Sequence, residues 1–118
     1  MEIKNFNIDG KEIIFVNDSH NTRYGFKHTS HLFIDGTERG DNTSNYINRT
    51  WECYRYQTCM LGLVNKLIEK REGFLKDKFK IENDYKVLTL KRQEEFDKVL
   101  KADDKMVFYE KLKNKIGF

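Results

Sequence analysis

The chain has 118 residues, of which 38% are hydrophobic and 35% charged, and its formal net charge is +3. This length supports one domain around a single core, and nine Phe, six Tyr and one Trp exclude a chain that is disordered throughout. The charge is lower than that of a dedicated nucleic-acid binder, although residues 61–118 carry 15 basic against 11 acidic side chains. No apolar run reaches the length of a signal peptide or a membrane span, so we expect no membrane partner.

The first predicted element is a β-hairpin. The Asp9-Gly10 pair separates two short strands, residues 2–8 and residues 11–17. Asp-Gly between apolar runs is typical of a hairpin, because both positions tolerate the positive φ that a tight turn requires. The two strands are therefore expected to pair antiparallel.

A second hairpin follows directly along the chain. Residues 22–34 form a longer strand, and its even-numbered positions are the more apolar, so they are expected to face the core. Asp35-Gly36 then turns the chain into a polar strand that ends near Tyr46. Residues 1–48 thus predict a four-stranded antiparallel meander.

The second half of the chain is predicted to be helical. A long helix is expected over residues 49–73, with Gly73 as its stop, and residues 74–87 form a connector. Residues 88–118 form a helical hairpin, in which Asp103 or Asp104 can cap the last helix. The predicted fold is a single α+β domain: a meander, a long helix packed on the sheet, and a C-terminal helical pair.

The long helix has two different faces. Its wide apolar arc would cover the sheet and leaves room for another helix or a second copy of the chain. On the other face, Trp51 and Arg55 are i,i+4 neighbours suited to cation–π stacking. A glycine inside a helix costs about 1 kcal/mol relative to alanine, which close approach by another backbone or a ligand would explain at Gly62. The candidate binding residues on this face are Arg49, Trp51, Arg55, Thr58, Gly62 and Lys66.

Three interpretations of this face stay open. Trp51 can fold over the sheet with the stem of Arg55 packed on its indole ring. Alternatively, the face is a protein contact surface, because Trp, Arg and Tyr are over-represented at interface hot spots. A third interpretation is a nucleotide or nucleic-acid site, since cations interleaved with aromatic rings suit single strands and Arg49 lies at a helix N-terminus, which favours anions.

No catalytic or metal-binding arrangement is predicted. His28 and His31 lie on one strand with side chains on opposite faces, so they cannot share an ion without a bulge. A nucleophile pair of Cys53 or Cys59 with His28 requires the helix to lie over that strand, and a cysteine on an apolar arc is usually inert. We therefore expect a protein that is not an enzyme and has no metal or cofactor.

The run Asn48-Arg-Thr-Trp-Glu-Cys-Tyr-Arg-Tyr-Gln57, preceded by Thr22–His28 and Leu32–Gly36, resembles a pattern in small bacteriophage proteins. The likeness covers roughly residues 13–68 and leaves the C-terminal helices unconstrained. These phage proteins have no agreed biochemical activity, so the resemblance transfers no catalytic residue. It implies a context, because small phage proteins of this architecture often act on host defence. Anti-CRISPR proteins bind an effector complex, and Thoeris inhibitors sequester a signal molecule.

The resemblance and the Trp51 face together predict a non-enzymatic, anti-CRISPR-like phage accessory protein in the host cytoplasm. It would inhibit a defence system by stoichiometric binding of the effector, a host defence protein or ribonucleoprotein complex. The alternative is a nucleotide or RNA binder, or a sponge for a signal molecule, whose binding would depend steeply on salt. A third hypothesis is a phage assembly domain that forms a homodimer through the wide apolar arc.

Overall fold

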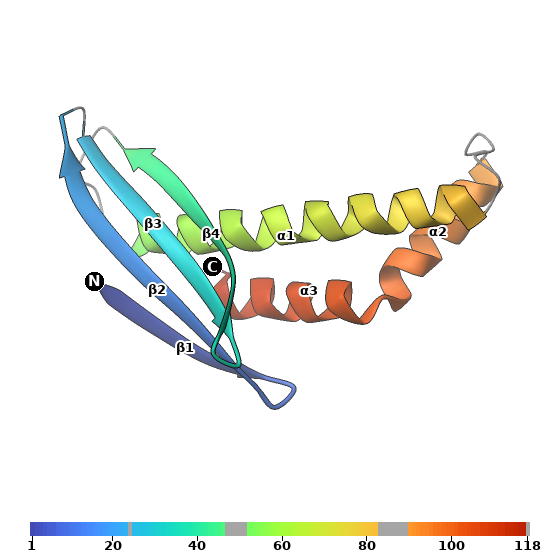
Figure 1. The fold of residues 1–118 in the computed structure, drawn as a ribbon, viewed down its shortest axis with the longest axis horizontal. Helices are drawn as coiled ribbons and strands as arrows, with labels where there is room; N and C mark the ends of the chain where they lie inside the picture. The colour runs from blue at the N-terminus through green and yellow to red at the C-terminus, as the bar shows by residue number, and fades with distance from the viewer. Residues whose placement is uncertain (24, 47–51, 83–89, 118) are drawn as a thin grey trace.

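The computed structural model describes residues 1–23, 25–46, 52–82 and 90–117. A four-stranded sheet stands at one end of the molecule, and three helices extend away from it (Figure 1). The elements are β1 (Glu2–Ile8), β2 (Lys11–Thr22), β3 (Gly25–Ile34), β4 (Thr37–Tyr46), α1 (Glu52–Glu82), α2 (Leu90–Ala102) and α3 (Asp104–Ile116). The predicted α+β fold is confirmed.

The sheet is an antiparallel meander with the strand order β1-β2-β3-β4. Both predicted Asp-Gly turns are present, with positive φ at Asp9, Gly10, Asp35 and Gly36, as tight hairpin turns require. The β2 strand is longer than predicted, because its polar end continues to Thr22. The additional residues of β2 pair with the first half of β3. This backbone pairing keeps them in a strand although their sequence lacks the alternating apolar pattern.

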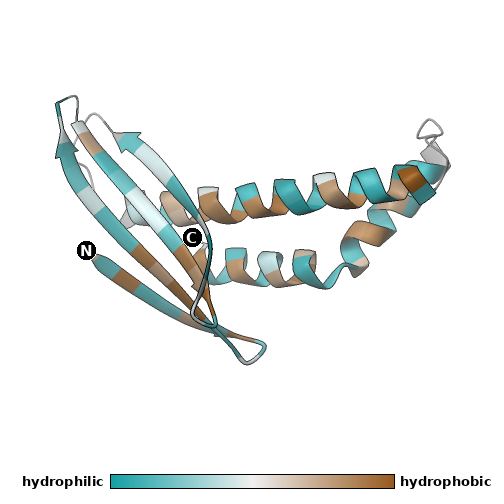
Figure 2. Ribbon diagram, in the orientation of Figure 1, coloured by the Kyte–Doolittle hydropathy of each residue, from teal (hydrophilic) through white to brown (hydrophobic). Residues whose placement is uncertain are grey.

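One face of the sheet is buried under α1. His28, Ser30 and Leu32 alternate along β3 as buried residues, which confirms the predicted core face. Phe15 and Ile13 of β2 lie on the same face and are fully buried. Figure 2 shows brown segments of β2 and β3 near the β3–β4 turn and a teal β2 toward its far end, so the apolar core occupies only part of the sheet.

The first long helix does not stop at Gly73, contrary to the prediction. It runs to Glu82 and includes much of the expected connector. A β-carbon at Gly73 would meet no atom within 4 Å, so this glycine is an open position inside the helix. Leu75 and Phe79 continue the helix because they pack against Phe96 of α2, and that burial outweighs the low helix propensity of one glycine.

The last helix returns along α1 to the sheet. Asp103 is its N-cap, as predicted, and a side-chain oxygen accepts a hydrogen bond from the Met106 backbone N–H. Leu112 and Ile116 of α3 are buried in the main core with residues of the sheet and α1. An exposed ion pair between α3 and the β1–β2 turn, from Lys111 Nζ to a carboxylate oxygen of Asp9, spans 2.9 Å.

Among the residues that the structure describes, the buried apolar side chains form two hydrophobic cores, in place of the single core that the chain length predicted. The main core lies between the sheet, the start of α1 and the end of α3. A small second core of Leu75, Phe79 and Phe96 lies between the distal part of α1 and α2. We call the distal part of α1 together with α2 the helical arm, and it extends well beyond the sheet in a molecule measuring 50 × 35 × 24 Å (Figure 1).

Candidate functional site

The first turns of α1 fix which side of this helix faces the sheet. Its buried residues in this region are Tyr56, Cys59, Met60, Leu63 and Val64. Gln57 donates a hydrogen bond from Nε2 to the backbone oxygen of Ile116. The start of α1 is therefore held by the sheet on one side and by the end of α3 on another.

The structure describes only part of the predicted binding face. Thr58 and Lys66 are exposed on α1, so both are available to a partner. Arg49 and Trp51 lie outside the described residues, as does the side chain of Arg55. The predicted stacking of Trp51 on Arg55 therefore stays a prediction.

Gly62 faces the sheet instead of pointing outward with the rest of the predicted face. A β-carbon at this position would lie 2.6 Å from Nδ2 of Asn42 on β4. The same Nδ2 donates a 3.0 Å hydrogen bond to the backbone oxygen of Cys59. The glycine thus lets α1 approach β4 closely enough for this bond, which accounts for it without any ligand.

The Cys59 thiol is buried between α1 and the sheet. Its sulfur lies 3.1 Å from the Asn42 backbone oxygen and 3.6 Å from that of His28. The His28 ring instead meets Tyr56 edge-on, with 5.2 Å between ring centroids. The helix therefore does lie over β3, but Cys59 contacts the backbone of His28, and its burial is typical of a small hydrophobic residue.

The apolar stripe of α1 continues beyond the sheet. At about 100° per residue, Tyr56, Leu63, Phe74 and Ile81 lie within about 20° of one another around the helix. Tyr56 and Leu63 are buried under the sheet, whereas Phe74 and Ile81 are 56% and 59% exposed on the helical arm. The same face of α1 is therefore buried against the sheet in its first part and exposed to solvent in its distal part.

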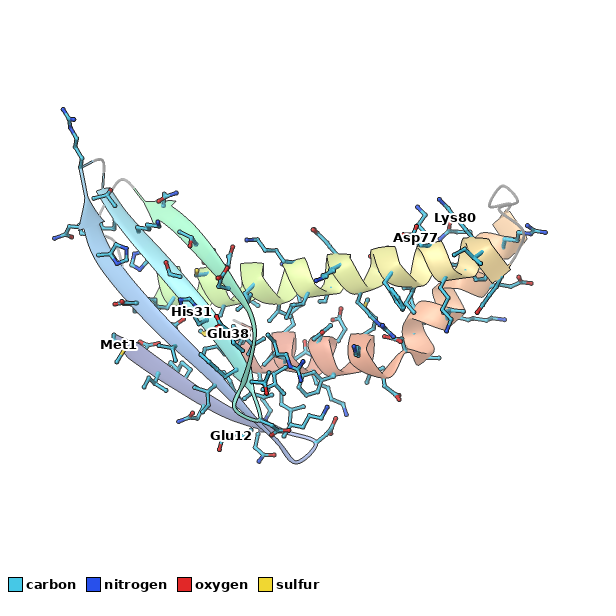
Figure 3. All side chains as sticks on the ribbon, in the orientation of Figure 1. Met1, Glu12, His31, Glu38, Asp77 and Lys80 are labelled. Atoms are coloured by element: carbon cyan, nitrogen blue, oxygen red, sulfur yellow. The ribbon has the colours of Figure 1, made fainter. Side chains whose placement is uncertain are left out.

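The exposed Phe74 ring is held in a fixed setting. The Arg71 guanidinium lies over it, with its Cζ 4.9 Å from the ring centroid. Arg71 is itself fixed by Asp103, through Nη2–Oδ1 and Nε–Oδ2 hydrogen bonds of 2.8 Å and 3.0 Å. Figure 3 labels Asp77 and Lys80, which mark this distal part of α1. We call Arg71, Phe74 and Ile81 the arm surface.

The positive charge of Arg71 in the arm surface is paired with the negative charge of Asp103. The hydrogen bonds from Arg71 lower the pKa of Asp103 below its ordinary value, and the backbone N–H of Met106 acts in the same direction. The hydrogen bond to Asp103 in turn raises the pKa of Arg71. Both groups are charged at neutral pH, so the pair stays formed and holds the guanidinium over Phe74.

The sequence prediction missed the arm surface because it ended the long helix at Gly73. The spacing of Leu63, Phe74 and Ile81 by eleven and then seven residues keeps one helical face, and that periodicity is the signal that could have found them. The presence of Gly73 outweighed this periodicity in the prediction, because a glycine next to a charged run is also the typical end of a helix.

No protein-family model, curated protein or solved structure matches the chain. Over the described ranges, every helix is too short or too polar to cross a membrane.

Proposed function

We propose that this chain is a non-enzymatic phage accessory protein that binds a host defence protein stoichiometrically and thereby inhibits it in the host cytoplasm. The observation that carries the proposal is the half-open stripe of α1, whose distal residues Phe74 and Ile81 are exposed. The resemblance of the Asn48–Gln57 run to small phage proteins supports the biological context.

The composition of the arm surface suits a protein partner. Phe74 and Ile81 are large apolar side chains exposed on one face of a helix. Helices that dock in the groove of a partner protein bind through apolar side chains spaced in this way. Arg and aromatic residues are enriched among interface hot spots. Because Asp103 already orders Arg71 over Phe74, the free protein has less side-chain entropy to lose when a partner covers them.

The charge of the second half of the chain indicates the chemistry of the partner. Residues 61–118 carry 15 basic and 11 acidic side chains. A partner with an apolar groove and an acidic rim would match both the arm surface and this bias. Lys66 is exposed nearer the sheet on the same helix, about 80° around the axis from Phe74, whereas Thr58 lies about 160° from Phe74 and so points away from this surface.

The test is inhibition of defence in living bacteria. The chain is expressed in strains that each carry one defence system, and phage plaquing is measured. We expect plaquing to rise in one strain and the effector to co-purify with the chain at a fixed ratio after nuclease treatment. Phe74→Glu and Ile81→Glu should lose both effects, because a charge opposes burial in the partner groove.

A matched control separates contact from general surface change. Ile3 on β1 is 53% exposed, so Ile3→Glu introduces the same charge at similar exposure but away from the helical arm. Ile3→Glu should retain inhibition, and circular dichroism should show all three variants folded. Inhibition that survives in folded Phe74→Glu and Ile81→Glu would refute the arm surface as the contact site.

The nucleotide or RNA-binding alternative uses Arg49, Arg55 and Lys66. Of these, Lys66 is exposed on α1, with the exposed Lys70 four residues further along the helix. It predicts that material recovered with the chain disappears on nuclease treatment. It also predicts that binding weakens steeply as salt rises. The homodimer alternative, in which two chains meet through the wide apolar arc of the long helix, predicts a mass of two chains by light scattering at micromolar concentration.

A further inference from the structure

Three potential metal ligands gather on the face of the sheet turned away from α1. Their ligating atoms, one from each of His31, Glu38 and Asp41, all lie within 4.8 Å of one another. His31 and Glu38 are labelled in Figure 3, and their Nδ1 and Oε1 atoms are 2.9 Å apart. This cluster lies on the sheet, so it is independent of the arm surface.

A β-bulge creates the cluster. Glu38 and Asp41 are three residues apart, and a regular strand would place them on opposite faces. In the β3–β4 ladder, however, Leu32 pairs with Gly40 and Phe33 pairs with Glu38. Arg39 is therefore an extra residue on β4, which brings both carboxylates to the face of His31.

The β3 strand supplies the third group in register. Asp41 is the direct cross-strand partner of His31, so the two side chains leave the sheet side by side. The neighbouring His28 of the same strand is fully buried on the other face, as predicted, and takes no part. The prediction that the chain has no metal site compared only the two histidines of β3, whose side chains lie on opposite faces of the sheet. It did not include the bulge in the neighbouring strand β4, which brings two carboxylates to the face of His31.

We propose that His31, Glu38 and Asp41 bind one divalent transition-metal ion, with Zn²⁺ as the expected ion. An imidazole with two carboxylates is a ligand set suited to zinc and its neighbours, whereas Mg²⁺ and Ca²⁺ prefer oxygen ligands alone. The side chains of His31 and Glu38 are 38% and 50% exposed, so an ion can reach them from solvent. Tetrahedral zinc–ligand bonds of about 2.0–2.2 Å place ligand atoms about 3.4 Å apart, so the 2.9 Å contact between His31 and Glu38 must widen slightly, which an exposed carboxylate can do by changing rotamer.

Three protein ligands leave one coordination position for water or for a group from another molecule. Sites with that open position differ from closed structural sites, which use four protein ligands. The site therefore offers an attachment point for a carboxylate, imidazole or thiolate on the outer face of the sheet, separate from the arm surface.

The test is calorimetric titration of the full chain with Zn²⁺ alone. We expect one ion per chain, and weakening of at least about tenfold in each of His31→Gln, Glu38→Gln and Asp41→Asn, a loss that even outer-shell changes produce at metal sites. His20→Gln is the matched control, because His20 is an exposed histidine of the same sheet, on β2. Excess Mg²⁺ should not compete.

Nuclear magnetic resonance of the imidazole signals provides a second readout. Zn²⁺ should shift the ring signals of His31 and leave those of His20 unchanged. Equal weakening by His31→Gln and His20→Gln, a stoichiometry other than one, or no binding would overturn the proposal. Full binding in Asp41→Asn would also overturn it, because Asp41 would then not be a ligand and the three-ligand site would not exist.

Discussion

At the scale of single residues, polar contacts set how closely α1 lies on the sheet. Asn42 bridges the two by donating to the Cys59 backbone oxygen, and it has room to do so only because residue 62 is a glycine. On the same buried face, Ser30 donates a 2.6 Å hydrogen bond to Oδ1 of Asn17. Such buried pairs are costly to break, because each group would be left without a partner away from water.

The two glycines inside α1 should respond in opposite ways to alanine. Gly62→Ala places a methyl group against Asn42 Nδ2 and should lower the free energy of unfolding, because overpacking costs about 1–3 kcal/mol and helix propensity returns about 1 kcal/mol. Gly73→Ala is the control and should raise it by about 1 kcal/mol, since its surroundings are open. Urea denaturation measures both, and stabilisation by Gly62→Ala would refute the close approach.

At the scale of elements, the start of α3 combines a cap with an ion pair. Asp103 accepts from the Met106 backbone N–H and also holds Arg71 of α1. The Asp103 carboxylate therefore caps α3 and also links the connection between α2 and α3 to Arg71 of α1.

Two variants at Asp103 separate these roles. Asn caps a helix as well as Asp does, so Asp103→Asn removes the ion pair and keeps the cap, whereas Asp103→Ala loses both and should cost about 1 kcal/mol more. The pKa of Asp103 is lowered in the folded state, so the ion pair stabilises the protein above the ordinary pKa of 3.8 and this contribution is lost as the pH falls further.

Urea denaturation at several pH values provides the measurement. Near pH 7, Asp103→Asn should unfold at lower urea than the wild type. The gap should narrow below about pH 4, because the carboxylate of the unfolded chain takes up a proton there, and it should close once the pH passes the lowered pKa of Asp103 in the folded protein. A gap that stays constant across this range would show that the ion pair contributes nothing to stability.

The sequence predicted elements where the signal is local. Both Asp-Gly turns, the alternation along β3 and the Asp103 cap depend on neighbouring residues, and all are confirmed. The extension of β2, the helix beyond Gly73 and the inward position of Gly62 depend on partners elsewhere in the chain. The bulge at Arg39 is of the same kind, because its position is set by pairing with β3. Of the members of the predicted binding face whose side chains the structure describes, Thr58 and Lys66 are exposed.

At the scale of the whole molecule, the buried apolar side chains of the described ranges belong to two cores of unequal size. The main core draws on the sheet, α1 and α3, whereas the second core rests on Leu75, Phe79 and Phe96 with Leu100 and Met106 partly buried beside it. A region with few buried contacts opens more readily than the rest of a protein. The helical arm should therefore open before the sheet does.

Hydrogen exchange monitored by mass spectrometry tests this order. Phe96→Ala removes a buried ring from the second core, a loss of about 3–5 kcal/mol in a well-packed site, and should raise amide exchange in α2 while β2 and β3 stay protected. Phe15→Ala is the contrasting variant and should raise exchange throughout, because Phe15 is fully buried in the main core. A uniform rise in Phe96→Ala would show that the two cores unfold together.

The bulged β4 strand has a further consequence for the behaviour of this protein at high concentration. A meander leaves its first and last strands with unpaired backbone groups, where strands of other molecules can add and start aggregation. β4 is polar along nearly all of its length and irregular at Arg39, and both features oppose such addition. β1 is regularly paired and carries the exposed Ile3, so any self-association through the sheet should begin there.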